Sequence, residues 1–430
     1  MSLTAAVDAP RRQARWVVVA FLGIFLFQRF AVPGLPISMT VPLLLLWACL
    51  ALFRGVVELD ARRTVIWLLA AGVSGLLMVP QSALVLFPLI SVNSWLLWMV
   101  TWLPMVFRFT DRSPQAYDTT LRGVAWAGLG LAGLSIVFTL SQVLGIRYRD
   151  IFAEVVPDAL QLQGFVITYP IAWESPIYKS NAWLALEPSF LSFMLGVAMV
   201  SALISLRHPL LVIGIGLGLL CTTAGSGMAV AGVYLIAALL SGRGRALTRY
   251  LIVAIPLAVI GALTALGDSV LDRLTEAGDA RSSTALRMIE PYTYLVPQWL
   301  SDPVRMLVGG GPGSSQRVVD DVGVLGLLVP TPAKMLYDYG LIGGLLMLAM
   351  ILVVYLRSPA PELAVALAVS MLTLQGAAQP LVAMSLLMIS LFAPVARASV
   401  EPDPVAAPAV VLRQERPSER LTARQPVGGP

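Results

Sequence analysis

The chain has 430 residues, of which 58% are hydrophobic and only 12% are charged. Soluble domains carry about a quarter charged residues, so this composition, with a mean hydropathy of +0.82, excludes a soluble enzyme. The net charge of +5 suggests a nucleic-acid partner, but the basic residues are placed along the chain as in a protein that contacts lipid.

Cysteine and histidine are too rare to build a metal site or a disulfide framework. The two cysteines, Cys49 and Cys221, lie far apart within apolar runs. The single histidine, His208, precedes Pro209 in a short turn, where we expect a structural role. The sequence therefore predicts no metal, no cofactor and no nucleic-acid partner.

Long apolar runs extend over most of the chain. A helix that spans a bilayer needs about 20 mainly apolar residues, and twelve runs meet or approach this length. In chain order they are Trp16–Val32, Ile37–Phe53, Thr64–Val79, Trp95–Phe107, Val124–Leu144, Pro188–Leu206, Leu210–Thr223, Met228–Leu240, Tyr250–Leu266, Met335–Leu356, Leu363–Ala378 and Leu381–Ala396. Because the fourth, seventh and eighth are short, we predict an all-α polytopic membrane protein with about 10–12 transmembrane helices.

The basic residues predict the orientation of these helices. If the connecting segments alternate between the two sides, 19 of the 29 Lys and Arg residues fall on one side, together with both termini. The positive-inside rule makes that side cytoplasmic. We therefore predict a cytoplasmic segment 1–15, a membrane domain 16–396 in the bacterial inner membrane with long periplasmic loops at 145–187 and 267–334, and a disordered cytoplasmic tail 397–430.

The two long loops contain the basic residues of a periplasmic face that otherwise has almost none. Guanidinium groups match phosphate oxygens, and Tyr and Trp can stack on sugar rings, so this pattern predicts a lipid-linked oligosaccharide as ligand. The candidate ligand-binding residues are Arg147, Arg149, Arg281, Arg305 and Lys334. The alternative is an ordinary interfacial aromatic belt with solvated charges.

Arg287 is the strongest candidate among the arginines. Ser282, Ser283 and Thr284 can cap a helix that carries it, and Leu286, Met288, Ile289 and Leu295 give that helix an apolar side. The pattern predicts an amphipathic helix lying on the bilayer, with Arg287 binding a diphosphate. The alternative is a side chain that extends to the lipid headgroups.

A glycine cluster, Gly309–Gly313, follows in the second loop. It lacks the Lys-Ser/Thr ending of a nucleotide-binding loop, so we exclude nucleotide binding. The backbone N–H groups of Gly310, Gly311 and Gly313 remain candidates for binding pyrophosphate oxygens. The alternative is a flexible turn.

Two carboxylates at predicted helix ends are candidates for the general base of a glycosyl transfer. Glu187 precedes Pro188 at the start of the sixth apolar run, and Asp338 lies between Tyr337 and Tyr339. The alternative for each is a favourable charge at a helix N-terminus. Arg29, near the outer end of the first run, is expected to extend to the headgroups.

These segments resemble the Wzy-type polysaccharide polymerases of the O-antigen ligase and polymerase superfamily, especially those of exopolysaccharide clusters such as that for xanthan. The resemblance rests on Trp183–Ser192, on Ser282–Arg287 with Pro291 and Trp299, on Gly309–Ser314, and on Tyr337–Gly344. It extends through the topology over nearly all of residues 15–396.

The resemblance implies a GT-C-like, metal-independent glycosyltransferase. The residue patterns above give Glu187, Arg287 and Asp338 as its predicted catalytic residues. The enzyme would polymerise undecaprenyl-pyrophosphate-linked oligosaccharide repeat units into exopolysaccharide at the periplasmic face of the inner membrane. Membrane lipid, a flippase and chain-length or export proteins would be its partners.

Two departures from the superfamily pattern bear on the choice of function. Ligases carry a histidine in the large outer loop, whereas this chain has Pro332-Ala333-Lys334 where a His-Asn pair is often found, which favours a polymerase. Some polymerases are described as carrying an Arg that is followed by a Gly after ten residues, and this pattern is absent as well. A flippase or transporter of the same lipid-linked oligosaccharide, and an O-antigen-type ligase, remain the alternative functions.

Overall fold

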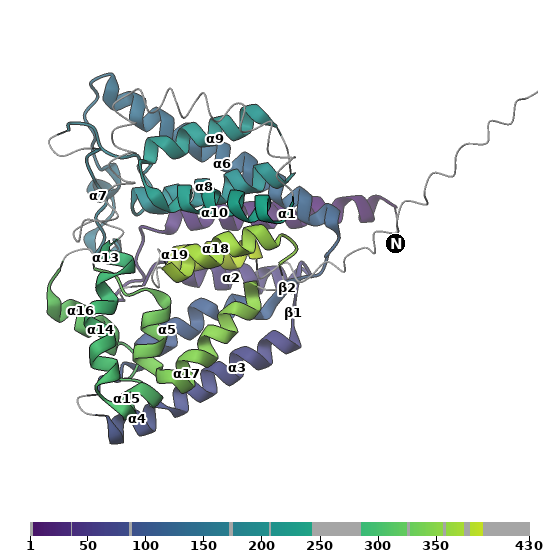
Figure 1. Cartoon of the computed structure of the whole chain (residues 1–430). Coiled ribbons are helices and arrows are strands. Elements are labelled where there is room, and N and C mark those ends of the chain that lie inside the picture. Colours follow the sequence, from purple (N-terminus) through teal and green to yellow (C-terminus); the bar gives the residue numbers. More distant parts are fainter. Residues whose placement is uncertain are drawn as a thin grey trace, which may run out of the picture. The chain divides into compact units, whose positions relative to one another are not determined.

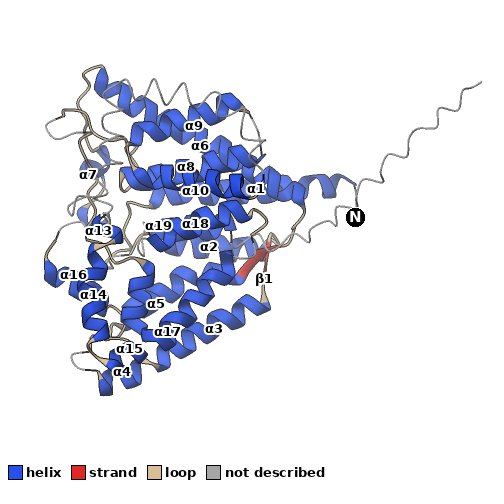
Figure 2. Cartoon of the chain, viewed as in Figure 1, coloured by secondary structure: helices blue, strands red, loops and turns tan. Residues whose placement is uncertain are grey.

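The computed structural model of the chain consists mainly of helices (Figure 2). The structure describes residues 3–389 except 36, 86–87, 172–174, 206–207, 243–284, 325–326, 356–357 and 374–378. All described elements belong to one unit, Met1–Val395.

The elements before the second long loop are mostly apolar helices. They are α1 (Leu3–Phe27), α2 (Thr40–Phe53), β1 (Val57–Leu59), α3 (Ala61–Leu76), α4 (Met78–Leu84), α5 (Val92–Trp102), η1 (Leu103–Val106), β2 (Phe107–Phe109), α6 (Pro114–Val143), α7 (Ile151–Val155), η2 (Asp158–Leu160), α8 (Pro188–Ser205), α9 (Pro209–Thr222) and α10 (Gly225–Leu240). Side chains that accept backbone N–H bonds fix three of the starts: Asp60 before α3, Ser91 before α5 and Ser113 before α6.

The second long loop contributes short helices before the last three apolar ones. These elements are α13 (Ala285–Met288), α14 (Glu290–Leu300), α15 (Pro303–Val308), α16 (Ser314–Val322), α17 (Thr331–Tyr355), α18 (Pro361–Thr373) and α19 (Gln379–Ile389). Both long loops thus carry ordered secondary structure in their described parts.

The predicted helical architecture is confirmed. Eleven of the twelve predicted apolar runs overlap a helix, whereas the ninth, Tyr250–Leu266, and the tail 397–430 lie outside the described residues. Within the part of the chain that the structure describes, four helical stretches are long and apolar enough to span a membrane: Ala61–Leu84, Pro114–Val143, Pro188–Ser205 and Thr331–Tyr355. Six further apolar helices are shorter.

A small sheet was not predicted. Strands β1 and β2 pair antiparallel, with Val57 opposite Phe109, and the side chains of both residues are buried. Across the same ladder Arg108 donates to Glu58 at 2.7 Å. The pattern was missed because each strand has only three residues and is embedded between long apolar helices.

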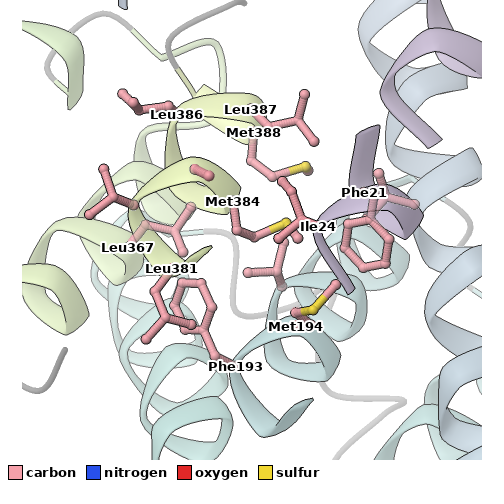
Figure 3. Close-up of a cluster of buried hydrophobic side chains, with 14 of the residues drawn as sticks. Phe21, Ile24, Phe193, Met194, Leu367, Leu381, Met384, Leu386, Leu387 and Met388 are labelled. Carbon is pink, nitrogen blue, oxygen red and sulfur yellow. The ribbon is translucent and has the colours of Figure 1, made fainter. Parts of the chain in front are cut away.

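The helices enclose one main apolar core. Figure 3 shows Phe21 and Ile24 of α1, Phe193 and Met194 of α8, and Leu381 and Met384 of α19 directed toward one another. Helices α8 and α10 approach so closely that a Cβ added at Gly227 would overlap the carbonyl oxygen of Ser192. Only glycine permits that contact, which is a common way for apolar helices to pack in lipid.

The described parts of the two long loops lie at the same end of the helix bundle. Figure 1 shows α7, α13, α14, α15 and α16 at that end, with β1 and β2 at the opposite end. The arrangement places the loop residues singled out above on one face of the molecule.

Candidate functional site

The first long loop is attached to the outer ends of α1 and α6. On α6, the Gln142 side chain accepts from the Tyr178 N–H at 2.8 Å and donates to the Tyr178 carbonyl at 3.2 Å, as a neighbouring strand would. These two bonds fix the position of Tyr178, and with it the loop, at the end of α6.

Aromatic rings of this loop stack on one another. The ring centroids of Phe138 and Trp183 are 5.0 Å apart, those of Phe138 and Tyr148 are 5.3 Å apart, and those of Tyr148 and Tyr178 are 5.6 Å apart. Burial raises the pKa of the Tyr148 hydroxyl above its usual value. Since these rings pack against each other in tilted or edge-to-face pairs, this part of the aromatic content stabilises the loop.

The prediction that Arg29 extends to the headgroups is wrong. Its side chain is 1% exposed and makes a two-pronged ion pair with Asp150 of the first loop, at 2.7 and 2.9 Å. It also donates to the Trp183 carbonyl at 3.0 Å and lies 4.2 Å from the centroid of the Phe152 ring. A nearby carboxylate made pairing inside the protein more favourable than exposure to headgroups.

A strained turn precedes the candidate base Glu187. Ala182 and Trp183 have φ values of 49° and 60°, in the left-handed region that non-glycine residues rarely occupy. The Trp183 N–H donates to the Asn181 side chain at 3.0 Å, and the Ala182 N–H donates to the Ser180 hydroxyl at 3.3 Å. Strain of this kind is concentrated at functional sites, because only a well-determined surrounding structure can sustain it.

Glu187 lies directly before α8, as the Glu187-Pro188 pair predicted. Its carboxylate accepts from the Val166 N–H at 3.3 Å and from the Ser189 hydroxyl at 2.9 Å. One oxygen also lies 3.5 Å from a guanidinium nitrogen of Arg287. The structure thus joins residues of the two long loops that were predicted independently.

The contact between Glu187 and Arg287 is the loosest of the described ion pairs at this end of the molecule. Its 3.5 Å separation is at the limit for a hydrogen bond, whereas the Arg29–Asp150 pair reaches 2.7 Å. The Arg287 side chain is 21% exposed. Its guanidinium therefore has access to a ligand without losing a strong internal partner.

The glycine cluster folds against α17, where that helix is broken. Gly340 has φ 65° and ψ −169°, and a Cβ there would overlap the Leu307 carbonyl oxygen. The break directs the Tyr337 and Asp338 carbonyls to the N–H groups of Gly310 and Gly311, at 2.8 and 3.0 Å. Gln81 of α4 completes this join between the glycine cluster and α17 by donating to the Val308 and Asp338 carbonyls.

Asp338 binds the glycine cluster through its side chain as well. This fully buried carboxylate accepts from the N–H groups of Gly313 and Ser315, from the Ser314 hydroxyl and from the Lys334 ammonium group, at 2.8 to 3.1 Å. The N–H groups of Gly310, Gly311 and Gly313 are therefore all bonded within the protein. This geometry favours a structural role for Asp338 and the loop over direct contact with pyrophosphate.

The other candidate basic residues have separate surroundings. Lys334 is paired with Asp338, and Arg305 donates to the Tyr337 hydroxyl at 3.1 Å. Arg147 is exposed, and the exposed Arg149 pairs with Glu154. Arg281 lies outside the described residues. Among the predicted arginines that the structure describes, Arg287 is the one that contacts the candidate base of the other long loop.

The amphipathic helix predicted around Arg287 differs from the observed one. It is divided at Ile289 into α13 and α14, and Leu295 is buried inside the protein. Leu295 belongs to a second, smaller apolar cluster with Val319, Leu327, Val329, Ala333 and Tyr337. The apolar side of α14 thus packs on the second loop itself because that loop has its own core.

The pairing of Arg29 with Asp150 and the role of Gln81 were not predicted. The signal available was a charged or amide side chain in or beside an apolar run, which indicates a buried partner. Among the described residues, no group of three or more His, Cys, Asp and Glu side chains has the geometry of a metal site.

Comparison of the sequence with protein-family models and with curated proteins gives no match.

Proposed function

We propose that this chain is a polysaccharide polymerase of the inner membrane. It joins undecaprenyl-pyrophosphate-linked oligosaccharide repeat units at the periplasmic face. The contact of Glu187 with Arg287 carries this proposal, since it brings a carboxylate and a partly exposed guanidinium from different loops to the start of α8. A base and an anion-binding group side by side are what glycosyl transfer from a diphosphate requires.

Two helix N-termini support an anion at this position. The Ser226 hydroxyl of α10 donates to the Ser189 carbonyl of α8 at 2.5 Å, so the first turns of both helices meet beside Glu187. The N-terminal end of a helix carries a partial positive charge that stabilises phosphate oxygens. Together with Arg287 it would neutralise the charge that develops on a departing diphosphate.

The proposed reaction needs only groups of this site. The acceptor is a sugar hydroxyl of a new lipid-linked repeat unit, and the donor is the polymer on its lipid diphosphate. The hydroxyl oxygen forms a bond to the anomeric carbon while the bond from that carbon to the diphosphate oxygen breaks. Glu187 takes the hydroxyl proton, and Arg287 moves from Glu187 to the diphosphate.

The broken helix α17 favours the second candidate, a flippase or transporter of the same lipid-linked sugars. Transporters bind their cargo where membrane helices are interrupted, and Asp338 and Lys334 lie within the candidate span Thr331–Tyr355. However, the carbonyls freed at this break already accept bonds from the glycine cluster and Gln81. We therefore place the polymerase first.

Deletion of the gene and analysis of its lipid-linked sugars distinguishes the two functions. We expect single repeat units to accumulate on the outer leaflet, because units that have crossed the membrane would no longer be joined. Accumulation on the inner leaflet would instead identify a flippase. Complementation with the wild-type chain serves as the control.

The topology proposal of about twelve spans can be tested with phosphatase fusions. A phosphatase fused after Leu300 should be active, since α14 lies with the other long-loop elements that we assign to the periplasm (Figure 1). A fusion after Arg245, in the Arg-rich segment, should be inactive. Activity after Arg245 would contradict the orientation.

A further inference from the structure

Arg29 makes more contacts than attachment of the first loop requires. Its bidentate pair with Asp150 and its position over the Phe152 ring already join α1 to α7. A third bond, from Nη1 to the Trp183 carbonyl at 3.0 Å, reaches a different part of the loop. A bond from a charged donor is stronger than one between neutral groups.

The peptide that receives this third bond belongs to the strained turn. Four hydrogen bonds within residues 180–185 accompany the left-handed conformation of Ala182 and Trp183. The N–H groups of residues 182 and 183 donate to the side chains of Ser180 and Asn181, and those of residues 184 and 185 donate to the carbonyls of Ala182 and Asn181. On the upstream side, the Ser180 N–H is fixed to the Cys221 carbonyl at 3.1 Å. The left-handed conformation is unfavourable for non-glycine residues, so the turn would relax if it lost an outside bond.

Relaxation of the turn would displace Glu187. Only Leu184, Ala185 and Leu186 separate Trp183 from Glu187, and the side chains of Ala185 and Leu186 are fully buried. A movement at Trp183 is therefore transmitted to the carboxylate, whose contact with Arg287 is already 3.5 Å long.

We infer that Arg29 and Asp150 are positioning residues for Glu187: Asp150 orients the buried Arg29 guanidinium, Arg29 holds the strained turn, and the turn sets the carboxylate at Arg287. This inference rests on the proposed function for its kinetic consequence. Its structural part, that Arg29 maintains the turn, holds for any activity of this site.

The main variant removes both charges together. Arg29→Met with Asp150→Leu leaves no unpaired charge in the protein, and replacement of a buried pair by apolar side chains is often tolerated. Arg29→Lys is the conservative variant, since an ammonium group keeps the charge but not the fork that reaches Asp150 and Trp183 together. Arg63→Met is the matched control, a buried arginine that donates to the Phe107 carbonyl at 3.5 Å beside the β1–β2 sheet.

Hydrogen exchange and steady-state kinetics are measured on the full chain in lipid nanodiscs. In the double variant we expect the amides of residues 182–185 to exchange about tenfold to a hundredfold faster, the equivalent of one charge-assisted bond. Turnover should fall by a similar factor while KM for a lipid-linked repeat unit stays within about twofold. Arg29→Lys should lie between this variant and the wild type, and Arg63→Met should leave exchange at 182–185 unchanged.

Unchanged exchange at 182–185 in the double variant would overturn the inference, because the turn would then hold without Arg29. Faster exchange with unchanged turnover would overturn the positioning role, since Glu187 would not depend on the turn. If the wild-type chain forms no polymer, the proposed function fails, and the exchange measurement still decides whether Arg29 holds the turn.

Discussion

Glu187→Gln should lower polymer turnover by about 10² to 10⁴, the usual contribution of a general base. The amide has the shape of the carboxylate: its oxygen can still accept from the Val166 N–H, and its NH2 group can donate to the Ser189 hydroxyl oxygen. Folding should be preserved, whereas the proton of the attacking hydroxyl would lose its acceptor. The measurement is polymerisation of a purified lipid-linked repeat unit, with KM determined separately from turnover.

Ser189→Ala is the matched control for this variant. It removes a 2.9 Å bond to the same carboxylate but leaves the charge of Glu187 in place, so turnover should change far less. Near-normal polymerisation by an intact Glu187→Gln protein would contradict the base assignment. The charge effect of a carboxylate at a helix N-terminus is at most about 1 kcal/mol at an exposed site and would account for such a result.

Asp338→Asn should strongly destabilise the protein. The substitution leaves the Lys334 ammonium group, which lies 2.8 Å from Asp338 and is 12% exposed, without its carboxylate. Loss of one partner of a buried ion pair costs about 3–5 kcal/mol. An amide oxygen in place of Oδ1 can still accept from Ser314 and Ser315, but an NH2 group in place of Oδ2 cannot accept from the Gly313 N–H, so the glycine cluster also loses a bond. A fall of several degrees in the thermal unfolding temperature in detergent is the expected result.

A double variant, Lys334→Met with Asp338→Asn, is the control for this ion pair. It should recover part of the lost stability, because no unpaired charge remains. If folded Asp338→Asn protein polymerises normally at low temperature, Asp338 is structural. If the folded Asp338→Asn protein has lost turnover, Asp338 is a catalytic residue. An unfolding temperature of Asp338→Asn equal to that of the wild type would contradict the role assigned to the ion pair.

Local sequence patterns predicted much of the fold. Apolar runs gave the helices, and the Glu187-Pro188 pair gave the start of α8, because a helix start depends on adjacent residues. The glycine cluster predicted an unusual backbone but not its partner. Gly310 and Gly311 bond to carbonyls that only the break at Gly340 exposes, and the apolar run around Gly340 gave no sign of an interruption.

Contacts between distant segments could not be predicted. Glu187 and Arg287 are 100 positions apart, and Arg29 and Asp150 are 121 positions apart. Each pair forms because helix packing brings loop ends together, which no single segment encodes. For this reason Arg287 was predicted to bind a ligand without its carboxylate neighbour, and Arg29 was predicted to reach the headgroups.

The join at Gln81 has a consequence for the order of assembly. Gln81 bonds to the carbonyls of Val308 and Asp338, which follow it by 227 and 257 positions. This contact therefore cannot form before α17 has been synthesised, since α4, α15 and α17 must all be present. Bringing residues so far apart in sequence together lowers the conformational entropy of the chain between them before their contacts can stabilise the fold. The docking of α4 on α17 therefore follows the synthesis of α17 and is one of the contacts with the largest sequence separation in this fold.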